Sequence, residues 1–447
     1  MMKKTLLLIL CLLILIETAQ AMTMSEAVNK AISNNPQIAQ SQTEVKAAQA
    51  KVREIQSKRN PNISFTAVLA GMDKAPSMEL PEMHMNLGPL GERTLALPSL
   101  PLSNETISTG AFSLTVPITT GGRIENGIRQ AKAGEAATIL KYEAVKKETA
   151  FQTVKAYLTA ILAEKIENAN SFAYDTVNEH VITANKLFEQ RQIAKYELFR
   201  AETELANAKK RLVDSQNNRK LAVAVLKTIM GEPDSDDMAL DSSIYEATIL
   251  EISTDEKNAL ENSEILKALS AKDEMYKSAE KLAHSEHMPI LAGFASRIVY
   301  SNDQPFTTPK HIAGLMLSVP LYDGGTSSAK AQEQSALALG NKYERLKTEN
   351  NIKLEIIKYT LEMQTAQESL KANEKSIETA KEALRLAKRR FEEGVGTGIE
   401  VSDASLSLLT TETNQFMSLY QYKSAYYCLA KYSERFWEIL GVSENSL

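Results

Sequence analysis

The stretch from Gly325 to Phe391 constrains the fold of this chain more than any other. It contains no proline, and Gly340 is its one internal glycine. Its apolar positions recur every seven residues, and a second series of mostly small residues lies between them. The two series are Ile356, Met363, Leu370, Ile377, Leu384 and Phe391, and Tyr359, Ala366, Asn373, Ala380 and Ala387. This pattern predicts a supercoiled helix on the order of 100 Å long that packs on neighbouring helices.

The same residue pattern occurs earlier in the chain, at a constant offset of 203 residues: position 116, for example, corresponds to position 319. Phe188 corresponds to Phe391 at this offset, so the register holds through some seventy residues. Such a register indicates an internal two-fold repeat. At the junction between strand and helix, the equivalent pairs are Pro117 and Pro320, Gly121 and Gly324, and Gly122 and Gly325.

Each copy reads as helix, strand, loop, strand, very long helix, tip and helix. The expected first repeat covers residues 22–233, with strands at about 62–70 and 110–118, a long helix over 122–188, a tip at 190–197 and a helix over 197–230. An acidic connector without a clear period is expected at 234–255. The expected second repeat covers residues 256–447, with strands at about 290–300 and 311–322, a long helix over 325–391, a tip at 393–399 and a helix over 399–440.

The first residues have the features of a secretory signal. Lys3 and Lys4 precede an apolar run over 6–16, and Ala-Gln-Ala at 19–21 is a small-residue cleavage site. The alternative is a membrane anchor, but an apolar run of about 11 residues is too short to span ~30 Å of hydrocarbon. We therefore expect a signal peptide at residues 1–21.

Composition excludes several classes of protein. Cys11 leaves with the signal, so Cys428 is the one cysteine of the mature chain and no intramolecular disulfide can form. The formal net charge of −5 argues against nucleic-acid binding. No other stretch is apolar and long enough for a transmembrane helix, so a membrane crossing would require β-strands.

The expected strands have the length and alternation of membrane-spanning strands. The apolar residues of one strand share a face, as do those of its counterpart: Phe112, Leu114, Val116 and Ile118, and Leu315, Leu317, Val319 and Leu321. The alternative to membrane-spanning strands is a small soluble β-sandwich.

Four strands cannot close a barrel, and open edges are not viable in lipid. Three copies of the chain would supply twelve strands, a number found in porin-like barrels.

Two motifs resemble those of the outer membrane efflux protein family, the TolC-like channel-tunnels. Residues 320–325 read P-L-Y-D-G-G, like the family's P-L-F-D-G-G. Residues 390–404 are similar without gaps to the family's R-Y-E-x-G-x-x-x-x-x-D-V-L-D-A, and the likeness covers essentially the whole mature chain. The resemblance implies a mainly α fold: a homotrimer with a shared 12-stranded outer-membrane β-barrel, four strands per protomer, continued by a long periplasmic α-helical barrel.

It also implies a passive export duct in the outer membrane of a Gram-negative bacterium. The duct would serve a tripartite efflux or type I secretion system and would dock a periplasmic adaptor and an inner-membrane pump. The cargo, whether drug, metal ion or protein, is left open. The alternative, from another class, is a periplasmic structural or adhesive coiled-coil protein without a pore.

Glu400 and Asp403 match the two acidic positions that ring the periplasmic entrance in the family. Their spacing puts both on one helix face, where carboxylates from several copies would favour cations. The alternative is an ordinary helix start, where the helix dipole favours acidic residues. Phe391 and Gly396 occupy the family's Tyr and Arg positions but cannot make the cross-links that close the entrance. At the first tip, ion pairs of Arg191 with Glu197 and of Glu197 with Arg200 could replace these cross-links.

The two tips are the expected docking sites for the adaptor, although turn residues also simply close a helical hairpin. The expected docking residues are Arg191, Gln192, Glu197, Gly394, Val395, Gly396 and Thr397.

We expect no catalytic site, no cofactor and no assigned metal site. No Ser-His-Asp or Cys-His constellation and no phosphate-binding glycine loop stand out. Met72, Met78, Met83, His84 and Met85 gather in the first loop, where thioethers and imidazole would suit soft Cu(I). Methionine also fills gaps in packed loops, so metal binding there stays open.

Overall fold

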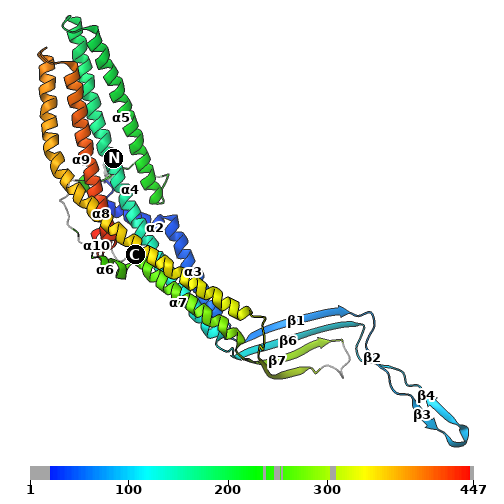
Figure 1. Ribbon diagram of the computed structural model, residues 1–447. Coiled ribbons are helices and arrows are strands. Elements are labelled where there is room, and N and C mark those ends of the chain that lie inside the picture. Colours follow the sequence, from blue (N-terminus) through cyan, green and yellow to red (C-terminus); the bar gives the residue numbers. More distant parts are fainter. Residues whose placement is uncertain (1–20, 235–237, 246–251, 253–254, 303–308, 443–447) are drawn as a thin grey trace, which may run out of the picture. The chain divides into compact units, whose positions relative to one another are not determined.

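The computed structural model describes residues 21–234, 238–245, 252, 255–302 and 309–442 (Figure 1). The expected signal peptide falls outside these residues, apart from Ala21, and the expected connector is described only in part. The chain divides into two compact units. Unit 1 comprises Met1–Val45, Thr138–Leu269 and Glu344–Leu447, and unit 2 comprises Lys46–Ala137 and Ser270–Tyr343.

The first half of the chain contains two long helices and two long strands. Its elements are α2 (Met24–Asn34), α3 (Pro36–Ser57), β1 (Asn62–Gly71), β6 (Thr106–Thr119), α4 (Arg123–Glu189) and α5 (Lys195–Ile229). The break between α2 and α3 falls at Asn35, directly before Pro36, because a residue before proline avoids the helical conformation. Thr23 and Glu26 form a capping box that fixes the start of α2.

The second half repeats this order with small changes. Its elements are η2 (Ser242–Tyr245), α6 (Glu256–Asn262), α7 (Glu264–His284), η3 (Ser285–His287), β7 (Ile290–Ser301), β8 (His311–Ser318), α8 (Thr326–Glu392), α9 (Gly398–Lys431) and α10 (Phe436–Ile439). The long helices α4 and α8 each have 67 residues, which follows from their shared heptad pattern.

The structure corrects three details of the sequence-based boundaries. The strand expected over 311–322 ends at Ser318, because Pro320 has no backbone N–H to donate to a ladder. The helix expected over 399–440 ends at Lys431, where the backbone N–H and hydroxyl of Ser433 both donate to the Ala430 carbonyl. The loop over 71–103 contains two small antiparallel ladders. Their strands are β2 (Ser77–Met78) with β5 (Leu100–Pro101), and β3 (Met83–Asn86) with β4 (Glu92–Leu95).

The main sheet lies in unit 2 and has four antiparallel strands in the order β1-β6-β7-β8. The central strand pair β6–β7 joins the two halves of the chain. Strands β1 and β8 have no second partner among the described residues. The sheet therefore has two open edges, which present unpaired backbone groups.

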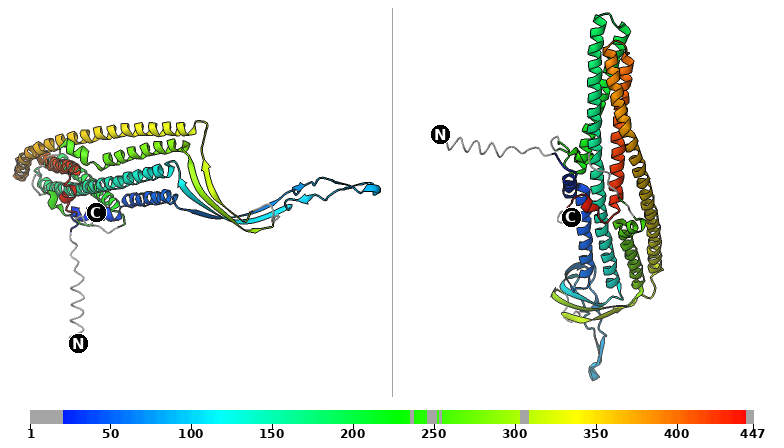
Figure 2. Two further views of the ribbon diagram at one scale, coloured as in Figure 1. Left: turned by 90° about the horizontal axis from the view of Figure 1, so that it is seen from below. Right: turned by 90° about the vertical axis from the view of Figure 1, so that its left-hand side faces the viewer.

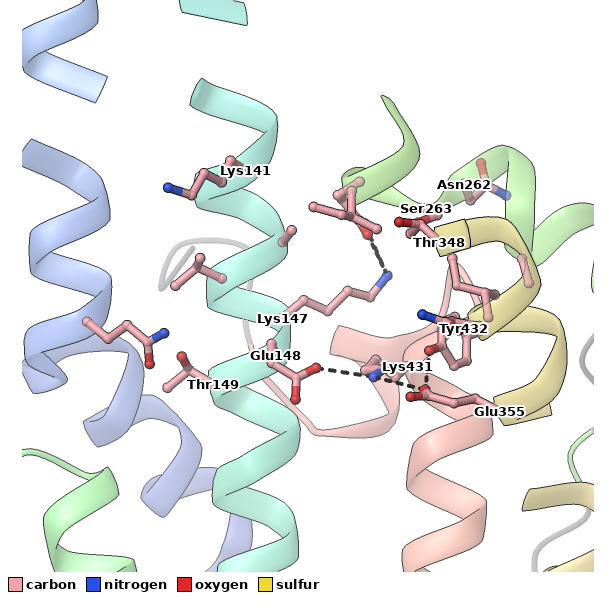
Figure 3. A pocket seen from close by; sticks show the side chains of 18 residues that line it. Lys141, Lys147, Glu148, Thr149, Asn262, Ser263, Thr348, Glu355, Lys431 and Tyr432 are labelled. Carbon is pink, nitrogen blue, oxygen red and sulfur yellow. Dashed lines mark hydrogen bonds and ion pairs between the residues drawn. The ribbon is translucent and has the colours of Figure 1, made fainter. Parts of the chain in front are cut away.

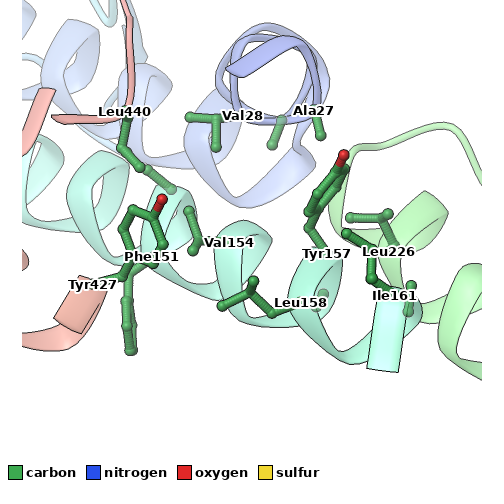
Figure 4. Packing of buried hydrophobic residues seen from close by; sticks show 14 of the residues in the cluster. Ala27, Val28, Phe151, Val154, Tyr157, Leu158, Ile161, Leu226, Tyr427 and Leu440 are labelled. Atoms are coloured by element: carbon green, nitrogen blue, oxygen red, sulfur yellow. The ribbon is translucent and has the colours of Figure 1, made fainter. Parts of the chain in front are cut away.

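The main core of unit 1 lies where α2 packs against α4, α5 and α9 (Figure 4). Tyr157 of α4 is almost fully buried in it, and its hydroxyl donates to the backbone carbonyls of Met22 and Asp241, 2.8 and 2.9 Å away. Leu158 and Ile161 pack beside it, each contributing about 1.5–3 kcal/mol of apolar burial. This core ties the N-terminal helix to the long helices.

Among the described residues, no helix is both long and apolar enough to cross a membrane.

Candidate functional site

The long helices of unit 1 end in two hairpin tips, one between α4 and α5 and one between α8 and α9 (Figure 2). Arg191 adopts a left-handed backbone with φ 59°, and Gly394 adopts the same conformation at φ 72° in the equivalent place. The N–H of Gln192 donates to the Leu187 carbonyl, as the N–H of Val395 donates to that of Arg390. Both helices thus end in the same type of C-cap, although one has arginine where glycine is normal.

The four helices at these tips share one apolar core, which we call the tip cluster. Its buried residues are Val181, Ala184, Leu198, Ala201, Ala380, Leu384, Ala387, Phe391, Val401 and Leu408. They come from α4, α5, α8 and α9, so the two hairpins form one packed bundle. The small alanines allow the helices to approach closely, as the second heptad series predicted.

The first turn of α9 carries the acidic pair. The hydroxyl of Thr397 accepts from the Glu400 N–H at 3.4 Å and caps this helix. Glu400 is half-buried and pairs with Arg390 of α8, 3.5 Å away, whereas Asp403 is exposed and has no ion pair among the described residues. The two carboxylates therefore differ: only Asp403 presents an uncompensated charge.

The suggested ion pairs of the first tip do not form. Within the part of the chain that the structure describes, Arg191, Glu197 and Arg200 make no ion pair with one another. Among the described residues, the ion pairs that join neighbouring helices near the tips include Arg390 with Glu400 and Lys388 with Glu179, the latter at 3.2 Å. These pairs could not be predicted from the residue pattern, because charged residues are frequent on every exposed helix face.

The strand–helix junctions lie in unit 2 and use paired glycines with positive φ. Gly121 and Gly122 have φ of 62° and 86°, and Gly324 and Gly325 have φ of 68° and 85°. Asp323 accepts from the N–H groups of Gly325 and Ser327 and so caps α8. The prolines of the two copies differ: Pro117 lies within β6 beside a register shift, whereas Pro320 follows the end of β8.

The structure separates the methionines and histidine of the first loop. Met83 and Met85 alternate with His84 along β3, so the imidazole lies on the opposite face of the ribbon. The His84 Nδ1 lies 3.1 Å from the Thr94 hydroxyl. Within the described ranges, no three His, Cys, Asp or Glu side chains gather as metal ligands would.

A cavity of about 420 Å³ lies in unit 1 among α4, α7, α8 and α9 (Figure 3). Lys431 reaches Glu148 at 3.2 Å and Glu355 at 3.8 Å, and Lys147 reaches Glu264 at 3.1 Å. The pairs of Lys431 with Glu148 and of Lys147 with Glu264 cross-link the two halves of the chain. Sequence reasoning missed them because the partners lie up to 283 residues apart and follow no period.

Comparisons with known proteins agree with this geometry. Residues 27–232 and 257–433 match the family model described as outer membrane efflux protein. Among curated proteins, no sequence matches the chain. The structure resembles the CmeC outer membrane channel of Campylobacter jejuni, with a TM-score of 0.74, 16% identity, and coverage of 92% of this chain and 85% of that chain.

Two further solved structures are similar. The outer membrane protein VceC of Vibrio cholerae has a TM-score of 0.71 and 16% identity, with 94% of this chain and 96% of that chain covered. The open state of the MtrE outer membrane channel of Neisseria gonorrhoeae has a TM-score of 0.72 and 14% identity, with 94% and 89% covered. At these identities the likeness concerns the fold.

Proposed function

The chain belongs to the outer membrane efflux protein family, and on that premise we propose that it is the outer-membrane channel of a tripartite export system. The observation that carries this proposal is the match of both halves of the chain to the family, combined with an antiparallel sheet that has two open edges. Cargo passes through the channel passively, and the partner pump supplies the energy.

The open sheet edges support a trimer. An unpaired edge cannot remain exposed in lipid, so β8 of one protomer pairs with β1 of the next. Three protomers with four strands each close a twelve-stranded barrel. Exposed apolar side chains on β1 and β8, such as Ile63, Leu69, Leu315 and Leu317, would then face lipid. The long helices continue from the barrel as a periplasmic duct, and the tips form its entrance.

Extraction and conductance test this function. We expect the full-length protein to be extracted from outer membranes by detergent as a heat-resistant trimer that conducts ions in planar lipid bilayers. A rod that is soluble in buffer and gives no conductance would instead support the structural coiled-coil alternative.

The acidic pair predicts cation selectivity. Because Glu400 is paired with Arg390, we expect Asp403→Asn to lower the cation-to-anion permeability ratio by roughly twofold or more, and Glu400→Gln to have a smaller effect. Reversal potentials in a salt gradient measure this ratio. Glu368→Gln, which removes an exposed carboxylate of α8 away from the tip, is the control. An Asp403→Asn channel as selective as the wild type would contradict the proposal that these carboxylates ring the entrance and favour cations.

The tips are the proposed adaptor-docking surface, and the buried native cysteine allows a clean cross-linking test. Cys428 is 1% exposed, and burial raises the pKa of its thiol to about 12, so it stays protonated and inaccessible to maleimides. Val395 is a better labelling position than Gly396, where a Cβ would lie 2.9 Å from the Arg390 Cβ. We expect Val395→Cys, but not the wild type, to label and to cross-link to a periplasmic adaptor.

Ser376→Cys, at an exposed position of α8 about 16 residues before the tip, is the matched control. If it captures the adaptor as efficiently as Val395→Cys, docking is not confined to the tip.

A further inference from the structure

A buried histidine lies at the tip cluster and belongs to no motif. His180 of α4 is 7% exposed, and its ring packs edge-on against Phe391 of α8 with 4.4 Å between the ring centroids. A Cβ at Gly398, the first residue of α9, would lie 2.9 Å from its Nε2 atom. The imidazole is therefore held between α4 and the α8–α9 hairpin, and a side chain at 398 would have to displace it.

The second copy of the internal repeat has no histidine at the equivalent position. At the offset of 203 residues, Ala383 of α8 is the counterpart of His180, and it is exposed. The Nδ1 of His180 is buried and has no hydrogen-bond partner among the described residues. A buried polar atom without a partner is costly, so an apolar side chain would pack here more favourably. A structural role in packing does not account for the imidazole.

We propose that neutral His180 is a positioning residue that holds the α8–α9 tip against α4 in the closed channel, and that protonation releases this contact. The inference rests on the proposed channel function. It assigns a closing contact at Phe391, where the family's tyrosine cross-link is missing.

The charged groups around His180 favour different protonation states. Glu179 of α4 and Lys388 and Glu392 of α8 line the same small cavity, while α9 contributes Val401 to it. Glu197 of α5 lies near Gly398. The carboxylates attract an imidazolium and Lys388 repels it, but Lys388 and Glu179 already form an ion pair. Burial is the dominant effect, and it lowers the pKa of His180 below its ordinary value of 6.5.

The sign of the pH effect follows from this lowered pKa. In the open tip the imidazole is hydrated and has a pKa of about 6.5. The closed state is fully favoured above that pH, and its advantage is lost as the pH falls below it. At pH 5.5 the closed-to-open equilibrium of each tip shifts toward the open state by up to about tenfold.

Single-channel recording of the full-length trimer in planar bilayers at pH 7.5 and 5.5 tests the proposal. Ordinary carboxyl groups stay ionised over this range, because their pKa values are about 4. We expect the open probability of the wild type to rise at pH 5.5, by up to about tenfold for each tip that must open. His180→Leu, and His180→Phe as a second packing variant, should change less than twofold. Gly398→Ala, which displaces the imidazole, should be open at both pH values.

Ala383→His is the matched control, because it adds an exposed imidazole at the equivalent position of the second copy. It should respond to pH as the wild type does. A His180→Leu or His180→Phe trimer that conducts and retains the full pH response would overturn the proposal. Absence of conductance in every protein, including the wild type, would contradict the channel function instead.

Discussion

Replacing Gly121 by alanine is expected to destabilise the folded protein by about 2–5 kcal/mol. Gly121 has φ 62°, a conformation that costs an L-residue roughly 1–2 kcal/mol. A Cβ there would also lie 2.2 Å from the Met288 Cβ and 3.1 Å from the Pro289 carbonyl oxygen. These atoms belong to the segment that leads into β7. The turn after β6 could therefore avoid the clash only by moving away from β7.

Gly122→Ala is the matched control for this prediction. It has the same type of backbone, with φ 86°, but a Cβ there would meet its nearest neighbour at 3.5 Å, an ordinary contact distance. Thermal unfolding followed by circular dichroism in detergent compares the two variants. The Gly121→Ala midpoint should be lower than that of Gly122→Ala by several degrees. Equal midpoints would show that backbone strain alone sets the cost and that the Met288 contact contributes nothing.

The architecture was predictable because the duplication preserves periodicity. Most positions of the apolar seven-residue series in α8, such as Ile356, Leu370 and Leu384, are buried, so the position of this helix could be read from the sequence alone. The ladders β2–β5 and β3–β4 were not predictable, since proline and methionine obscure the alternation in that loop. The end of α9 was missed because Ser433 stops the helix through a local hydrogen bond rather than through glycine or proline.

The candidate site was predictable only in part, for a different reason. The tip residues lie in short, contiguous motifs, so Glu400 and Asp403 could be found without coordinates. The compensation of Glu400 by Arg390 and the contact of His180 with Phe391 join separate helices. Nothing in the local sequence distinguishes a histidine buried between helices from one exposed on a helix face. Side-chain partners across a bundle follow from packing, and packing requires the structure.

The second large effect is expected at Gly324, which the duplication makes the counterpart of Gly121. Its φ is 68°, yet a Cβ there would meet nothing within 4 Å in the protomer. The difference has a simple cause: Gly121 follows β6, which is paired on both sides, whereas Gly324 follows β8, which is an edge strand. In the proposed trimer, β8 pairs with β1 of the next protomer. The partner subunit's Pro61, which lies just before β1, would then lie beside Gly324, as Pro289 lies beside Gly121.

Gly324→Ala should therefore impair assembly more than protomer folding. The substitution introduces three equivalent clashes per trimer, each costing about 1–3 kcal/mol. We expect the temperature at which trimers dissociate in SDS to fall by roughly 10 °C or more. Gly340→Ala, a helical glycine of α8 whose Cβ would also meet nothing within 4 Å, should leave the trimer intact. Gly324→Ala trimers as heat-resistant as the wild type would contradict the pairing of β8 with β1, because that pairing is what brings a neighbour to Gly324.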